Sequence, residues 1–176
     1  MIRRPPRAAR GLLCGLLALA GALTTARAAD DAQCAAKIAQ SLIPTLASPA
    51  ADGRWFRQID GPAPVIVTAP HVARVTRRGQ PRFADGPGTG ALALSLHRRC
   101  GVTVLHTTHA SPSDPNFYDD DPFKHALGRL IDERRPRLVL DIHASRAARP
   151  WHVDVGTMHG RSLLGQPALR ASLFDA

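Results

Sequence analysis

Short apolar runs rich in β-branched residues recur through the middle of the chain. They cover residues 65–69, 102–105 and 138–142, and a more mixed run covers residues 55–59. Runs of this length, bounded by turn residues, predict strands. A further strand is expected at residues 151–155.

Helical spacing fills the intervals between these runs. After Asp121-Pro122, a favourable helix start, one buried helical face is formed by apolar residues at i, i+4, i+7 and i+8: Phe123, Leu127, Leu130 and Ile131. Pro136 ends this helix. Further helices are expected over residues 32–46 and 89–99, and another begins near Pro167.

The order strand–helix–strand–helix–strand from residue 65 to residue 142 predicts an α/β domain. Its central sheet is expected to be mostly parallel or mixed, with right-handed crossovers. The arginine-rich segment 72–88 is predicted to be a loop outside the core, because it is polar.

The first 28 residues have the pattern of a secretory signal peptide. Four arginines precede an apolar stretch from Gly11 to Leu23, and Ala26-Arg27-Ala28 is a small-residue cleavage signal. The stretch is shorter than the roughly 20 residues that span a membrane. We therefore expect a periplasmic or secreted protein whose mature part, residues 29–176, is a single domain.

Charge argues against nucleic acid as a partner. The full chain has 23 basic and 14 acidic residues, a net charge of +9. Since the leader holds five arginines and no acid, residues 29–176 keep 18 basic side chains and a net charge of +4. Neither nucleic-acid binding nor, after leader removal, membrane attachment is expected.

Two cysteines remain in the mature part, Cys34 and Cys100. In an oxidising compartment they can form one disulfide that ties the N-terminal helix to the body. The alternative is two separate buried thiols.

Histidines lie at or just beyond the ends of the three apolar runs. Pro70-His71 follows the first run, His106 and His109 follow the second, and His143 follows the third. The carboxyl ends of parallel strands share one edge, where ligands bind, so two of these imidazoles can meet at one metal ion. His71 and His143 are the candidate ligands, and His106 with His109 is the alternative pair.

Two polar residues accompany this candidate site. Asp141 lies two positions before His143 and therefore shares its face of the strand, where a carboxylate can orient a ligand histidine. Asn116, in the loop after the middle run, can hydrogen-bond a substrate carboxylate. Alternatively, the segment Ser113–Asn116 makes only an Asx turn.

These segments resemble N-formylglutamate amidohydrolases over about residues 63–165. The resemblance rests on the order and spacing of five stretches: Ala69-Pro70-His71, Asp85 to Gly90, Asp114-Pro115-Asn116, Leu140-Asp141-Ile142-His143, and Val153 to Met158. It implies a three-layer, zinc carboxypeptidase-like α/β fold with one zinc ion at the sheet edge. His71 and His143 then bind the metal, and Asn116 contacts the substrate carboxylate.

The implied reaction is hydrolysis of an N-acyl amino acid or a peptide-like amide, with zinc polarising the carbonyl and activating water. Related enzymes carry an acidic ligand a few residues after the first histidine, where this chain has Arg74 and Val75. Asp85, the nearest acid in the following loop, is the candidate third ligand. The catalytic glutamate of the family corresponds to a position beyond residue 176, so we expect the C-terminal part of the domain to be missing.

Two other functions are compatible with the sequence. One is a non-catalytic binding protein of the same fold that has lost part of the metal site. The other is an exported domain of a different class whose histidines are incidental.

Overall fold

The computed structural model describes residues 27–145, 148–150 and 153–172. The chain divides into two compact units, one ending at Ala144 and the other beginning at Ser145. Each unit is described by itself. Residues 1–26 of the predicted signal peptide lie outside the described residues, and residues 27 and 28 belong to a helix that extends to residue 42.

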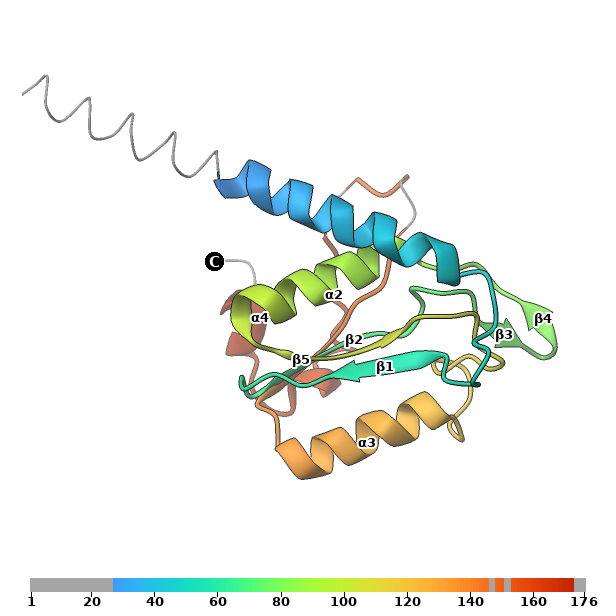
Figure 1. Cartoon of the computed structure of the whole chain (residues 1–176). Coiled ribbons are helices and arrows are strands. Elements are labelled where there is room, and N and C mark those ends of the chain that lie inside the picture. Colours follow the sequence, from blue (N-terminus) through green and yellow to red (C-terminus); the bar gives the residue numbers. More distant parts are fainter. Residues whose placement is uncertain (1–26, 146–147, 151–152, 173–176) are drawn as a thin grey trace, which may run out of the picture. The chain divides into compact units, whose positions relative to one another are not determined.

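The first unit is built on an open, mixed, four-stranded sheet, so the chain has an α/β fold (Figure 1). The spatial order is β1 (Phe56–Ile59), β5 (Thr103–Thr107), β2 (Val65–Ala69) and β6 (Leu138–Asp141). Strand β2 pairs in parallel with both β5 and β6, whereas β1 pairs antiparallel with β5. All four predicted apolar runs are therefore strands of one sheet.

The prediction of a fifth strand at residues 151–155 is wrong for residues 153–155. Residues 151 and 152 lie outside the described residues, and residues 153–155 have no strand structure. Val153 is 69% exposed. Alternation of apolar residues cannot make a strand when no neighbouring strand accepts its backbone hydrogen bonds.

Two long helices connect the parallel strands. Helix α2 (Pro87–Cys100) ends at Gly101, whose φ of 66° is the left-handed conformation that terminates helices. Helix α3 (Pro122–Arg134) begins as predicted, because the Asp121 side chain accepts a hydrogen bond from the Phe123 N–H at 2.8 Å. The N-terminal helix continues into the short 3-10 helix η1 (Ile43–Thr45).

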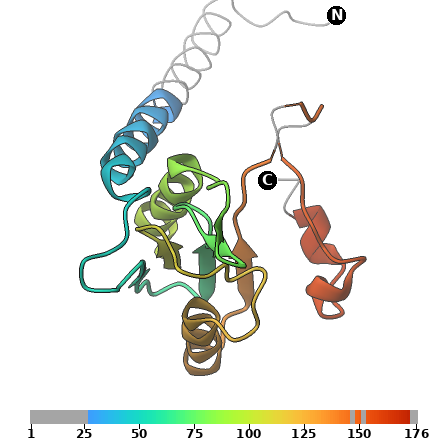
Figure 2. The same ribbon diagram turned by 90° about the vertical axis from the view of Figure 1, so that its right-hand side faces the viewer.

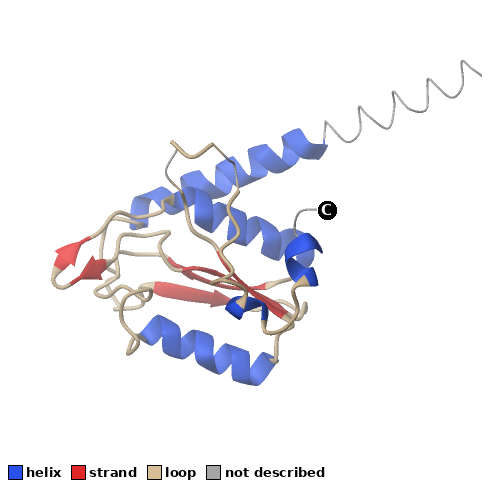
Figure 3. Ribbon diagram, turned by 180° about the vertical axis from the view of Figure 1, so that it is seen from behind, coloured by secondary structure: helices blue, strands red, loops and turns tan. Residues whose placement is uncertain are grey.

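These helices cover opposite faces of the sheet (Figures 1 and 3). On the α3 face, Ile66 and Leu105 pack with an aromatic group of Trp55, Phe56 and Phe123. On the α2 face, alternate strand residues pack with Ala93 and with Leu42 from the N-terminal helix. Because successive side chains of a strand point to opposite faces, the sheet contributes to two separate apolar clusters.

The segment 72–88 is more structured than its polarity suggests. The segment contains three buried residues, each at most 1% exposed: Val72, Ala73 and Val75. They are followed by a small hairpin of β3 (Thr76–Arg77) and β4 (Gln80–Pro81). The prediction of a loop outside the core is wrong here, because three apolar side chains pack inward while the arginines between and after them remain at the surface.

Both mature cysteines are free and exposed. The structure therefore contains neither the disulfide nor the pair of buried thiols considered from the sequence. Cys34 belongs to the helix over residues 27–42, and Cys100 ends α2.

The second unit contains the 3-10 helix η2 (Arg161–Leu163) and helix α4 (Ala168–Ser172). Within its described residues, 153–172, no hydrophobic side chain is buried. Among the helices of the part of the chain that is described, none has the length and apolar character needed to span a bilayer.

Phe123→Ala should lower the free energy of unfolding by about 3–5 kcal/mol, because the ring is 2% exposed in the aromatic cluster. Ile131→Ala, on the same helix but 38% exposed, is the matched control and should cost less than about 2 kcal/mol. Urea unfolding of both variants measures the difference. Equal losses would contradict this assignment of the core.

Candidate functional site

The parallel pairing of β2 and β6 brings two histidines together. Thr68 lies opposite Asp141 in this pair, so both strands end at the same edge of the sheet. The Ile142 N–H then donates to the Thr68 carbonyl at 2.8 Å, which extends the pairing towards the loops. Just beyond, the rings of His71 and His143 lie 5.0 Å apart between centroids.

Asp85 lies between the two imidazoles. Its N–H donates to the His71 carbonyl at 2.7 Å, which holds the loop before α2 against the end of β2. Its Oδ2 is 2.9 Å from His143 Nδ1 and 3.9 Å from His71 Nδ1. The three residues each offer one ligand atom, and these atoms all lie within 4.8 Å of one another.

Each histidine presents its second nitrogen to a supporting carboxylate. His143 Nε2 is 3.0 Å from Asp141 Oδ2, and His71 Nε2 is 2.9 Å from Asp114 Oδ1. Both Nδ1 atoms therefore face Asp85. This is the arrangement in which a carboxylate orients a metal-ligating imidazole from behind.

Asp141 is itself held in place. The Thr68 hydroxyl donates to its Oδ1 at 2.6 Å, leaving Oδ2 for His143. Burial opposes the charge on this carboxyl, but the hydrogen bonds from His143 and Thr68 outweigh that effect and lower its pKa. Asp141 therefore remains ionised beside the imidazole that it orients.

Asp114 was not singled out as a histidine partner from the sequence. It is 1% exposed, and Arg77 donates to its Oδ2 through Nε at 3.0 Å and Nη2 at 2.7 Å. Burial raises its pKa, but the hydrogen bonds from Arg77 and His71 prevail and lower it. The sequence does contain a signal for this role: Asp114 is an acid in the loop after the middle strand, which reaches the same sheet edge as His71.

Asn116 lies in the cluster as well as in a turn. Its N–H donates to Asp114 Oδ1 at 2.9 Å, which is the Asx turn considered from the sequence. Its side-chain Nδ2 lies 2.9 Å from His143 Nε2. One loop thus places Asp114 behind His71 and Asn116 beside His143.

His106 and His109 do not join this cluster. Strand β5 continues to Thr107, two residues further than predicted, so His106 lies within the sheet and is 2% exposed. Burial lowers the pKa of its imidazole. His109 Nδ1 lies 3.0 Å from the hydroxyl of Thr108.

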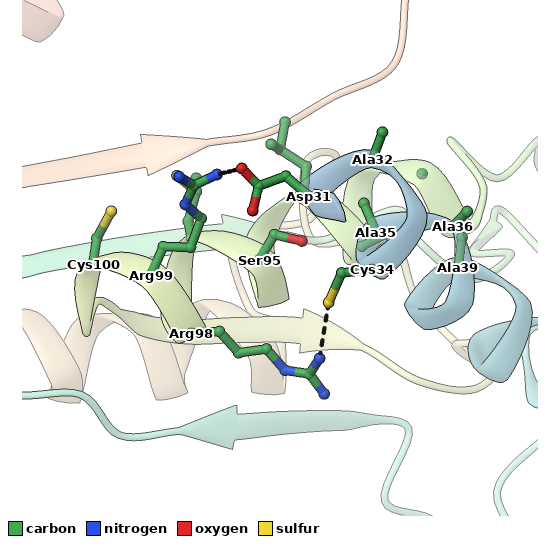
Figure 4. Close-up of a pocket in the computed structure, with 14 residues that line it drawn as sticks. Asp31, Ala32, Cys34, Ala35, Ala36, Ala39, Ser95, Arg98, Arg99 and Cys100 are labelled. Carbon is green, nitrogen blue, oxygen red and sulfur yellow. Dashed lines mark hydrogen bonds and ion pairs between the residues drawn. The ribbon is translucent and has the colours of Figure 1, made fainter. Parts of the chain in front are cut away.

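A separate apolar groove of about 690 Å³ lies between the helix over residues 27–42 and α2 (Figure 4). Cys34 and Cys100 both line it, and Arg98 Nη1 donates to Cys34 Sγ at 3.4 Å. None of the residues of the histidine cluster lines this groove.

Searches with family models, curated proteins and solved structures found no match to this chain.

The network around His143 predicts an unusual titration of the metal-free protein. Hydrogen bonds with Asp141 first and Asp85 second raise the pKa of this imidazole to about 10. Since the folded pKa exceeds the ordinary value near 6.5, the charged form stabilises the fold below about pH 6.5, and this contribution disappears as the pH rises through about 10.

NMR titration of the metal-free chain should show this raised pKa, and Asp141→Asn should shift it back towards the ordinary value. Asp132→Asn, on the exposed end of α3, is the control and should leave it unchanged. A His143 pKa near 6.5 in the unaltered protein would contradict the network.

Proposed function

We propose that this protein is an exported, zinc-dependent amidohydrolase similar to N-formylglutamate amidohydrolases, with a zinc carboxypeptidase-like fold. Its substrate would be an N-acyl amino acid or a peptide-like amide, and its location the periplasm or the exterior of the cell. The observation that carries the proposal is the pair of imidazoles that face Asp85 through Nδ1, each backed by a carboxylate at Nε2.

The donor set suits zinc. Two imidazole nitrogens and one carboxylate oxygen are ligands that catalytic zinc sites commonly use, with a fourth position left for water or substrate. Zinc–nitrogen bonds of about 2.0–2.1 Å imply ligand atoms roughly 3.4 Å apart. The present separations, up to 4.8 Å, need only a small inward movement of the side chains.

When bound, zinc would polarise the substrate carbonyl and lower the pKa of its water. The chain's own residues would position the ligands. Asp141 and Asp114 keep the protonated Nε2 atoms of His143 and His71 turned away from the metal, so that Nδ1 is free to bind it. Asn116, whose side-chain Nδ2 lies 2.9 Å from His143 Nε2, would contact a substrate carboxylate from the edge of the cluster.

Proton transfer from the water requires a general base. The described cluster offers no carboxylate that is not already paired with a histidine or an arginine. Zinc binding is therefore the direct test of the proposal for these 176 residues.

A metal-free binding protein is the second candidate. Arg74 stands where related enzymes carry an acidic ligand, and Asp85 makes a direct ion pair with His143. This ion pair needs no metal ion, because the charged imidazole of His143 neutralises the carboxylate of Asp85.

Zinc analysis of the full chain should find one ion per molecule, and His71→Ala or His143→Ala should abolish stoichiometric binding. Asp114→Asn should weaken zinc binding by about 10–100-fold, since it removes only the orienting carboxylate. Competition with a fluorescent chelator measures each affinity.

His125→Ala is the matched control, because this histidine is exposed on α3 and, among the residues that the structure describes, pairs only with Asp120. It should bind zinc like the unaltered chain. Absence of stoichiometric zinc from the folded, unaltered protein would refute the hydrolase proposal and favour the metal-free candidate.

A further inference from the structure

The hairpin beside the histidine cluster exposes an unusual combination of side chains. We call residues 77–83, which contain β4 and the end of β3, the arginine hairpin. It extends away from the four-stranded sheet (Figures 1 and 3), on the side of the molecule that faces the viewer in Figure 2. Every residue from 78 to 84 is exposed, and the Phe83 side chain is 98% exposed.

The charge of the hairpin is entirely positive. Arg77, Arg78 and Arg82 belong to it, and no acidic residue occurs between residues 72 and 84. Arg77 is neutralised by the buried Asp114. Arg78 and Arg82 form no ion pair within the described part of the chain, so their charges remain available to a ligand.

Aromatic side chains position two of the three arginines, Arg77 and Arg78. The guanidinium carbons of Arg77 and Arg78 lie 4.5 Å and 5.2 Å from the centroid of the Phe117 ring. The Arg78 N–H donates to the Tyr118 hydroxyl at 2.8 Å. Stacking limits the freedom of Arg78, so it loses less entropy when it binds a carboxylate.

The hairpin is joined to the histidine cluster on both sides. Asp85 follows Phe83 by two residues, and Arg77 reaches His71 through Asp114. Phe117, under the arginines, directly follows Asn116, which contacts His143. A molecule with a group at the cluster can therefore continue over the hairpin.

We propose that the arginine hairpin is a subsite for the acidic part of an extended, peptide-like substrate. This inference rests on the proposed function, and it adds that the substrate extends beyond a single amino acid. Arg78 lies in the turn between β3 and β4 and Arg82 follows β4, so the two guanidinium groups can meet separate carboxylates. Phe83 and Phe117 offer apolar contact to the chain between those carboxylates.

An anionic membrane is a weaker match for this surface. One of the three arginines is already used by Asp114, and the stacked pair is attached to the loop of Asn116. These contacts tie the arginines to the loop that holds Asp114 and Asn116, and therefore to the histidine cluster.

Fluorescence anisotropy on the full chain, with and without zinc, tests the subsite. The probes are labelled peptides of six glutamates and of six glutamines at low ionic strength. The glutamate peptide should bind at least tenfold more tightly, and the double variant Arg78→Ala/Arg82→Ala should remove most of that preference. Circular dichroism verifies that each variant is folded.

The double variant Arg129→Ala/Arg137→Ala is the control, since it removes the same charge from exposed arginines on α3 and before β6. It should keep the preference for glutamate. Equal losses in both double variants would reveal attraction by net charge alone and would overturn the subsite.

Two further outcomes would also overturn it. One is unchanged peptide binding after the hairpin substitutions. The other is a hairpin-specific loss of binding to vesicles of phosphatidylcholine with 30% phosphatidylglycerol without any loss of peptide binding, which would assign the surface to a membrane. If the preference for glutamate persists but zinc does not bind, the subsite stands and the hydrolase proposal fails.

Discussion

The candidate site depends on the parallel pairing of β2 with β6. Their register sets Thr68 against Asp141, so the two histidines that follow leave the sheet at the same level. A shift by one residue would turn Asp141 and His143 to the opposite face, because side chains alternate along a strand. The apolar cluster on the α2 face opposes such a shift, since it would turn Leu140 and Ile142 away from the cluster that they pack against.

Electrostatics then shapes the cluster that this register creates. Three carboxylates, from Asp85, Asp114 and Asp141, surround two imidazoles and one arginine. Each supporting carboxylate has a second donor, the hydroxyl of Thr68 or the guanidinium of Arg77, which offsets its burial. The imidazoles are therefore held in orientation before any ligand arrives, and a cation would replace the proton on His143.

The segment between β2 and α2 links the fold to this chemistry. Its buried residues Val72 and Val75 anchor it to the body, while its hairpin carries the exposed arginines. Arg77 is the connection, since it belongs to the hairpin yet pairs with the carboxylate behind His71. A ligand that moved Arg77 would therefore change the contact between Asp114 and His71, one of the two candidate metal ligands.

The sequence by itself determined the strands of the four-stranded sheet, the main helices and the α/β class, because these follow from local periodicity and from local signals such as Asp121-Pro122 at the start of α3. It also singled out His71, His143, Asp141 and Asn116, since residues at strand ends converge when strands are parallel. Only the tertiary structure decided that Asp114 supports His71, that Arg77 neutralises Asp114 and that His106 lies inside the sheet. Those outcomes depend on contacts between segments about 35–45 residues apart and on where β5 ends, and no local pattern encodes either.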